Sequence, residues 1–183
     1  MPLLAEALVE EWLNRQGYFT IRGIRTGVDE IDLLAVRLTE GKPEAIHVEA
    51  QVSFNPVGYI CPLPASLANE LGIARTSAKE RSREQMKLAT ERWITKKFTQ
   101  ARKREVRASL MPTATWKFMF VHGNVRSAIE LELLHQGGIR LTAFSEILAA
   151  LCDSEGERKF KGQAGSDIAD MLEFYAATNR EQQ

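Results

Sequence analysis

The segment EIDLLAVRLTEGKPEAIHVEAQVS, residues 30–53, carries the clearest strand pattern of the chain. Residues 30–38 form an apolar run typical of a buried strand, and residues 44–53 alternate apolar and polar side chains. The link between them, residues 39–43, has the composition of a turn and is short enough for an antiparallel hairpin. We therefore expect two neighbouring strands of one sheet.

Helices and further strands surround this hairpin. Residues 3–15 show apolar side chains at helical spacing, and residues 18–25 are rich in aromatic and β-branched residues, which predicts a helix followed by a strand. After a loop with several Pro residues over 54–71, one long helix is expected over 77–107. The remaining patterns predict a strand, a helix, a strand and a helix over 116–121, 126–135, 139–142 and 146–151.

This order of elements predicts an α/β fold in which a mixed β-sheet is flanked by helices. We expect one α/β domain over residues 1–152 and a polar linker that contains Gly over 153–165. Residues 166–183 are expected to form an extra C-terminal helix and a frayed tail. The apolar part of that helix, over 166–177, can supply a homodimer interface.

Composition narrows the class of protein. The 183 residues include 24 Lys+Arg and 24 Asp+Glu, and 44% are hydrophobic, which excludes disordered and fibrous classes. No run approaches the roughly 18 apolar residues that a membrane span needs, and the N-terminus is acidic where a signal peptide would be basic. We therefore expect a cytoplasmic protein without a membrane partner. Cys61 and Cys152 lie in dissimilar surroundings and indicate neither a disulfide framework nor a thiolate metal site.

Charge is distributed unevenly along the chain. Residues 75–107 hold 12 Lys+Arg and 4 Asp+Glu, so the rest of the chain is net negative. Such a basic segment is typical of a surface that binds a polyanion, but a long helix with a solvated basic face would have the same composition. Trp93 and Phe98 are expected in the core rather than as platforms for bases. The apolar side of the expected helix comprises Met86, Trp93, Ile94, Phe98 and Ala101.

Several common catalytic motifs are absent. The sequence has no G-x-x-x-x-G-K-[ST] phosphate loop, no G-x-G-x-x-G, no G-x-S-x-G nucleophile elbow and no H-E-x-x-H. Its histidines, His47, His122 and His135, show no spacing typical of metal ligands. Zinc and Ser-His-Asp chemistry are therefore not indicated, and a structural or surface role is expected for each histidine.

Two carboxylates stand out in the predicted hairpin. Asp32 lies inside an apolar run, where a carboxylate is costly unless a cation or several donors compensate it. On the next strand, the period of two places Glu49 and Gln51 on one face, opposite Ile46 and Val48. If the strands pair, Asp32 and Glu49 approach one another and form an oxygen-ligand site suited to Mg²⁺. The alternative is that both carboxylates pair with Lys or Arg, or lie in water.

The first helix offers a third carboxylate. At about 100° per residue, Glu6 falls close to Leu13 at the border of the apolar stripe, and it can therefore face the sheet. Glu6, Asp32 and the Glu49-x-Gln51 pair then form one constellation within a short stretch of chain.

At these residues the sequence resembles the PD-(D/E)xK nuclease superfamily, in particular its Holliday-junction-resolvase-like and Mrr-like restriction branches. The resemblance rests on Glu6 with Leu13 and Gly17-Tyr18, on residues 27–35 (GVDEIDLLA) and on residues 48–51 (VEAQ). It implies a restriction-endonuclease-like α-β-β-β-α-β core. It also implies that Asp32 and Glu49 hold Mg²⁺ or Mn²⁺, and that Glu6 helps to hold the metal or to orient its water.

Gln51 stands where the family usually has lysine. Glutamine is neutral and cannot act as a general base at pH 7, so a replacement cation is expected from Lys79 or Lys87. The resemblance implies a metal-dependent DNA endonuclease with Glu6, Asp32, Glu49 and Gln51 in its catalytic site. The alternatives are a catalytically inactive nuclease-like fold that binds nucleic acid or protein, and a purely structural domain. DNA phosphates would be contacted by Lys79, Arg83, Lys87, Lys96 and Lys97.

Overall fold

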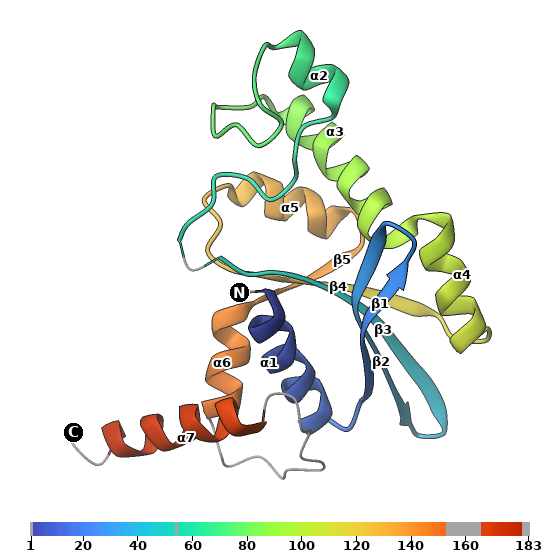
Figure 1. Cartoon of the computed structure of the whole chain (residues 1–183), viewed down its shortest axis with the longest axis vertical. Coiled ribbons are helices and arrows are strands. Elements are labelled where there is room, and N and C mark those ends of the chain that lie inside the picture. The colour runs from blue at the N-terminus through green and yellow to red at the C-terminus, as the bar shows by residue number, and fades with distance from the viewer. Residues whose placement is uncertain (1, 54, 153–165, 181–183) are drawn as a thin grey trace.

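The computed structural model describes residues 2–53, 55–152 and 166–180. One five-stranded sheet crosses the molecule, and helices cover both of its faces (Figure 1). The expected α/β class is thereby confirmed. In chain order the elements are α1 (Pro2–Arg15), β1 (Phe19–Thr26), β2 (Asp29–Thr39), β3 (Lys42–Gln51), α2 (Ala65–Glu70), α3 (Arg83–Ile94), the π-helical turn η1 (Thr95–Thr99), α4 (Ala101–Leu110), β4 (Trp116–His122), α5 (Ala128–Gln136), β5 (Ile139–Ala143), α6 (Phe144–Cys152) and α7 (Ser166–Arg180).

The sheet is mixed, with the strand order β1-β2-β3-β4-β5. The first three strands run antiparallel, whereas β4 is parallel to β3 and β5 is parallel to β4. The β2–β3 connection is the expected tight turn, in which Glu40 and Gly41 both have positive φ, at 52° and 74°. Positive φ at both central residues matches the right-handed twist of the two strands, which explains why so short a link closes the hairpin.

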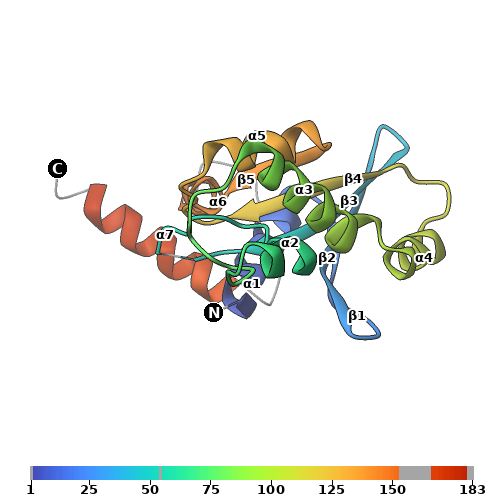
Figure 2. The ribbon, with the colours of Figure 1, turned by 90° about the horizontal axis from the view of Figure 1, so that it is seen from above.

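Two apolar cores lie on the two faces of the sheet. One core joins α1, α6 and α7 to side chains such as Leu33, Val48 and Met119. The other joins α2, α3 and α5 to Phe120 and Ile139. The alternation expected for β3 is confirmed, because Ile46 and Val48 enter the first core while the side chains of intervening residues face the other way. Seen from above, α7 extends from one end of the molecule, and α4 and the β1–β2 hairpin lie at the other (Figure 2).

The long helix expected over residues 77–107 is wrong in its bounds and its continuity. Helix α3 begins only after Ser82, whose side chain accepts a hydrogen bond from the backbone N–H of Gln85, while the Gln85 side chain accepts one from the N–H of Ser82. This reciprocal cap satisfies backbone donors of the first turn that would otherwise be unpaired. It fixes the start of α3 at Arg83, so residues 77–82 are not part of the helix.

A second interruption follows at the other end of α3. Residues 95–99 widen into a π-helical turn, and Gln100, with φ −57° and ψ 141°, leaves the helical region altogether. Helix α4 therefore begins in a new direction. Trp93 and Phe98 are buried as expected, but Ala101 is exposed, because the break turns it away from the apolar side.

Helix α7 packs against α1 and α6, so it joins the first core. The expected linker, residues 153–165, lies outside the described residues. Met171, Phe174 and Tyr175 are exposed on α7, and the homodimer interface expected there stays a prediction. Of the helices that the structure describes, none is long and apolar enough to cross a membrane.

Candidate functional site

The β2–β3 pairing brings the two predicted carboxylates together. Leu33 lies opposite Val48, so the antiparallel register continues to Asp32 beside Glu49. One oxygen of Asp32, Oδ2, accepts a hydrogen bond of 2.8 Å from the backbone N–H of Ala50. Desolvation, followed by repulsion from Glu49, raises the pKa of Asp32 to about 6, although Lys97 opposes this shift. Asp32 is thus a strand carboxylate whose charge is only partly compensated.

Glu49 has the opposite environment. It is fully buried, and its Oε2 accepts from Lys97 Nζ at 2.7 Å while its Oε1 accepts from Lys103 Nζ at 2.6 Å. His47 Nε2 lies 3.0 Å from the same Oε1. Burial alone would raise the pKa of Glu49, but the His47 hydrogen bond and the two lysines together hold this pKa below its ordinary value. Glu49 therefore carries a negative charge in the interior.

A buried arginine fixes the orientation of His47. Arg107 Nη1 lies 2.7 Å from His47 Nδ1 and also donates to the carbonyl of Phe98 at 2.8 Å. A guanidinium group can only donate, so Nδ1 accepts and the imidazole proton lies on Nε2, from which it is donated to Glu49. Burial lowers the pKa of His47, consistent with a neutral ring. His47 has the structural role that was expected for it.

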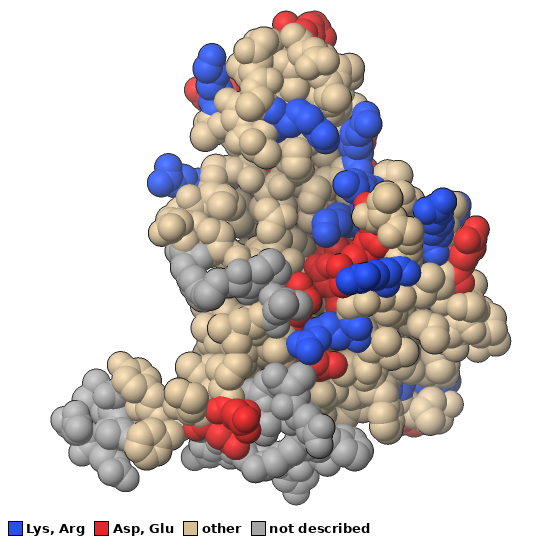
Figure 3. Space-filling view, in the orientation of Figure 1, with Lys and Arg blue, Asp and Glu red and all other residues tan. Residues whose placement is uncertain are grey.

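Glu6 lies at the edge of the same group of charges. Desolvation, followed by repulsion from Glu30, raises the pKa of Glu6, and both Glu49 and Lys97 are close enough to contribute. The half-buried helix side chain therefore faces the sheet, as its position in the helical pattern predicts. Figure 3 shows acidic side chains gathered where the end of α3 meets the β1–β2 hairpin, with Lys and Arg side chains around them.

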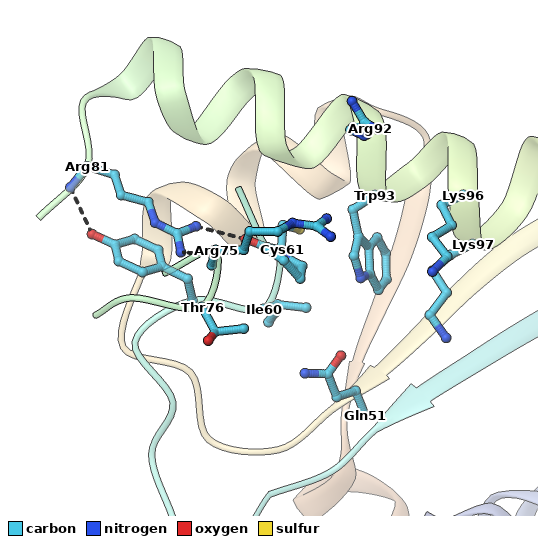
Figure 4. A pocket seen from close by; sticks show the side chains of 12 residues that line it. Gln51, Ile60, Cys61, Arg75, Thr76, Arg81, Arg92, Trp93, Lys96 and Lys97 are labelled. Atoms are coloured by element: carbon cyan, nitrogen blue, oxygen red, sulfur yellow. Dashed lines mark hydrogen bonds between the residues drawn. The ribbon is translucent and has the colours of Figure 1, made fainter. Parts of the chain in front are cut away.

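Gln51 is exposed at the end of β3, beyond the two carboxylates. It lines a cavity of about 360 Å³ that also reaches Lys97 (Figure 4). The position that is usually lysine in the resembled family thus faces open space beside an existing lysine. Gln51 is in place to contact a ligand but carries no charge.

The charged groups around Glu49 depend on the second interruption of the basic segment, at residues 95–100. Lys97 lies in η1, and Lys103 and Arg107 are one helical turn apart on α4. The widened turn and the break at Gln100 let both elements direct cations at one carboxylate. Gln100 Nε2 also donates to Asp29 Oδ2 at 3.1 Å, which ties the break to the start of β2.

Sequence reasoning missed Lys103 and Arg107. Helix α4 has almost no apolar stripe, and the residues that it buries are these two cations. Buried cations on a helix need a buried anion as partner. In the sequence, Glu49 is a candidate for this anion, because it lies in a strand between two apolar residues. No sequence rule predicts that Glu49 pairs with Lys103, because the two residues are 54 positions apart.

The expected replacement cation is corrected. Lys79 and Lys87 are exposed, and among the described residues the lysines that pair with Glu49 are Lys97 and Lys103. Lys79 precedes the helix, and Lys87 lies on the solvent side of α3, so neither is directed at the sheet. Glu49 therefore pairs with lysine, as the alternative interpretation of the sequence predicts.

The predicted DNA contacts divide into two groups. Lys79, Arg83, Lys87 and Lys96 are exposed, with Arg83 3.5 Å from Glu132 and Lys96 3.7 Å from Asp29. Lys97 is only partly exposed, because it is held by Glu49. The exposed group leaves cations on α3 and on the segments at its two ends for a polyanion, whereas Lys97 belongs to the carboxylate site.

A metal ion beside Asp32 and Glu49 would have few protein ligands. Across residues 2–53, 55–152 and 166–180, no three His, Cys, Asp or Glu side chains gather in an arrangement that could hold a metal ion. The pair Asp32 and Glu49 remains, and Mg²⁺ is commonly held by one or two carboxylates with waters and substrate phosphates completing the shell.

Comparisons with known proteins give no name to this site. No model of a protein family matches the chain, and no curated protein does. Among solved structures, the chain is similar to the crystal structure of AF1548, a protein of unknown function. The two chains are 13% identical, each is covered to 100%, and the TM-score is 0.47. The function is therefore argued from the residues of the site.

Proposed function

We propose that the protein is a metal-dependent nuclease that hydrolyses phosphodiester bonds in DNA. The observation that carries this proposal is the grouping of Asp32, Glu49 and Lys97, with Lys97 Nζ 2.7 Å from Glu49 Oε2. Two carboxylates and a lysine are the groups that the PD-(D/E)xK family uses. The order of α1, three antiparallel strands, the helical segment α2 to α4 and the parallel strand β4 also supports the resemblance to a restriction-endonuclease-like fold.

The residues fit a hard divalent cation. Asp32 Oδ2 accepts from Ala50 N–H, and no other hydrogen bond to Asp32 is formed within the described residues, which leaves Oδ1 for a ligand. Its raised pKa reflects burial and repulsion from Glu49, and a bound cation would relieve both. Asp32 and Glu49 would hold Mg²⁺ or Mn²⁺, which when bound polarises the scissile phosphate and supplies a hydroxide at neutral pH.

Lys97 supplies the cation that lysine at position 51 would supply in the resembled family. Burial would lower the pKa of Lys97, but Glu49 and Asp32 outweigh it and raise this pKa. Lys97 therefore stays protonated at neutral pH, so it stabilises negative charge on the phosphate rather than removing a proton. Gln51 lines the same cavity, and its amide would donate a hydrogen bond to a phosphate oxygen bound there.

Lys103, His47 and Arg107 act behind Glu49. Lys103 and His47 both hold Oε1, and Arg107 holds His47, so the carboxylate cannot rotate freely. These are positioning residues, because they act through Glu49 and are themselves buried. Oε2, which faces Lys97, is the oxygen that remains for a ligand when Lys97 moves to a phosphate.

Cleavage assays test the proposal directly. Supercoiled plasmid and labelled single-stranded DNA are incubated with Mn²⁺ or Mg²⁺ and with the wild type, Asp32→Ala or Glu49→Ala. The proposal expects nicking that requires the cation and is lost in both variants. Unchanged nicking in the variants would assign the activity elsewhere or to a contaminant.

A second candidate is a binding module without catalysis. It is favoured by one observation: both oxygens of Glu49 are already paired with lysine ammonium groups. In that case DNA binding would persist in Asp32→Ala, and no divalent cation would bind to the wild type. The plasmid assay combined with a DNA-binding measurement separates the two candidates.

A further inference from the structure

The cavity beside Gln51 is strongly cationic. Five of its lining side chains are basic, and none is acidic. They come from the loop between α2 and α3 and from the α3–η1 segment, and they face the loop after β3 across one space (Figure 4). The basic residues are Arg75, Arg81, Arg92, Lys96 and Lys97.

The wall of this cavity is built around a buried arginine. Arg81 donates to the carbonyls of Cys61, Arg75 and Ser77, and its guanidinium lies 4.0 Å from the centre of the Tyr59 ring. Its Nε is buried and has no hydrogen-bond partner within the described part of the chain. An unpaired donor on a buried cation is costly, so this arginine is held in the wall by its other contacts and adds positive charge to the cavity.

Arg75 is held in place but has donors to spare. Its Nε donates to the carbonyl of Leu63 at 2.8 Å, and this is the hydrogen bond that its side chain forms within the described residues. The two Nη groups therefore remain for a ligand, in the planar arrangement that suits phosphate. Lys96 is exposed on the facing element.

An aromatic side chain completes the cavity. Trp93 projects from α3 into the space above Gln51 (Figure 4). Its ring packs against Phe120 at a centroid distance of 4.8 Å. The cavity thus offers cations for a phosphate and the edge of a core aromatic ring for a base, in a volume at the small end of the range for ligand sites.

From this arrangement we infer that the cavity binds one unpaired nucleotide of the substrate strand, next to the phosphodiester that is cut. This inference rests on the proposed function. Gln51 and Lys97 belong to both the cavity and the carboxylate site, so a nucleotide in the cavity is adjacent to Asp32 and Glu49. A cavity of about 360 Å³ is comparable in size with one nucleotide, so the preferred substrate is a single strand or a frayed end, in which a nucleotide is free to enter it.

Binding in EDTA tests the inference without cleavage. Fluorescence anisotropy is measured with a labelled short oligothymidylate and with a blunt duplex, for wild type and for Arg75→Gln/Lys96→Gln. Lys42→Gln is the matched control, because Lys42 is exposed at the opposite end of β3, about 30 Å from Gln51. Circular dichroism checks that each variant is folded.

The wild type is expected to bind the single strand at least tenfold more tightly than the duplex. The double variant should lose about tenfold for the single strand and little for the duplex, while Lys42→Gln changes neither. Equal losses for both substrates, or no loss, would overturn the inference. Competition by thymidine monophosphate as strong as that by the oligonucleotide would reassign the cavity to free nucleotides. Normal selectivity without any cleavage in Mn²⁺ would instead refute only the proposed function.

Discussion

Two carboxylates on adjacent strands are held in opposite states. Asp32 has a raised pKa because its burial is compensated by few donors, whereas Glu49 has a lowered pKa because two lysines and a histidine surround it. A carboxylate that destabilises the fold while its neighbour is fully satisfied is typical of a functional site rather than a structural one.

Replacing Asp32 should stabilise the protein. An unfolded aspartate ionises near 3.8 and the folded one near 6, so the wild type loses stability as pH rises through this window and does not regain it above. Asp32→Asn keeps an acceptor for the Ala50 N–H and removes the charge. Its free energy of unfolding should exceed that of the wild type by about 3 kcal/mol at pH 7.5 and by little below pH 4.

Chemical denaturation across this pH range measures the difference. Glu40→Gln, at the exposed β2–β3 turn, removes one carboxylate from the surface and is the control. Addition of Mn²⁺ at pH 7.5 should raise the melting temperature of the wild type but not of Asp32→Asn. An Asp32→Asn protein less stable than the wild type at every pH would mean that the carboxylate is structural.

At the scale of elements, α4 is docked by charge rather than by apolar contacts. The side chains that it buries are Lys103 and Arg107, and they pack against Glu49 and His47. Removing one partner of a buried ion pair leaves the other charge uncompensated, which is more costly than removing an exposed pair.

Lys103→Met should therefore cost about 3 kcal/mol of unfolding free energy and loosen α4. Lys117→Met is the matched control, because Lys117 forms an ion pair of 2.9 Å with Glu44 but is 67% exposed. Its cost should stay below about 1 kcal/mol. Amide hydrogen exchange should show faster exchange in residues 101–110 of Lys103→Met alone. Equal exchange in both variants would mean that α4 is held by other contacts.

The sequence predicted most of these elements but not how the basic segment is divided. The strands, the hairpin and the flanking helices follow from local periodicity and turn composition. The Ser82–Gln85 cap also has a local signature, but it was hidden within a longer stretch of helical spacing. The π turn and the break at Gln100 have no such local signature. The helical hydrogen bonds that are lost there are compensated by ion pairs of Lys97 and Lys103 with Glu49, which depend on tertiary contacts. Asp32 and Glu49 were found because polar residues in apolar strands need partners, but the identity of those partners depends on long-range packing.

At the scale of the whole molecule, a near-neutral chain places its cations along one segment. The exposed members, such as Lys87 and Lys96, lie on α3 and η1 beside the cationic cavity. Phosphate contacts from such a surface release counterions, so affinity for nucleic acid should fall steeply with salt.

Lys87→Gln should weaken binding of single-stranded DNA uniformly over sequences and reduce the slope of log K against log salt by about 1. Lys42→Gln, remote from the segment, should leave the slope unchanged. Anisotropy titrations at several salt concentrations measure both slopes. If the Lys87→Gln slope equals that of the wild type, the nucleic acid does not follow α3.

The most direct test of the proposed nuclease centre moves the lysine from position 97 to position 51. Cleavage of labelled single-stranded DNA in Mn²⁺ is compared for wild type, Lys97→Met, Gln51→Lys and the double variant. We expect Lys97→Met to lose at least a hundredfold in rate and Gln51→Lys to restore much of it in the double variant, because position 51 faces the same cavity wall. A wild type that cuts no DNA, or a Lys97→Met protein that cuts as fast as the wild type, would contradict a nuclease centre built on Asp32, Glu49 and Lys97.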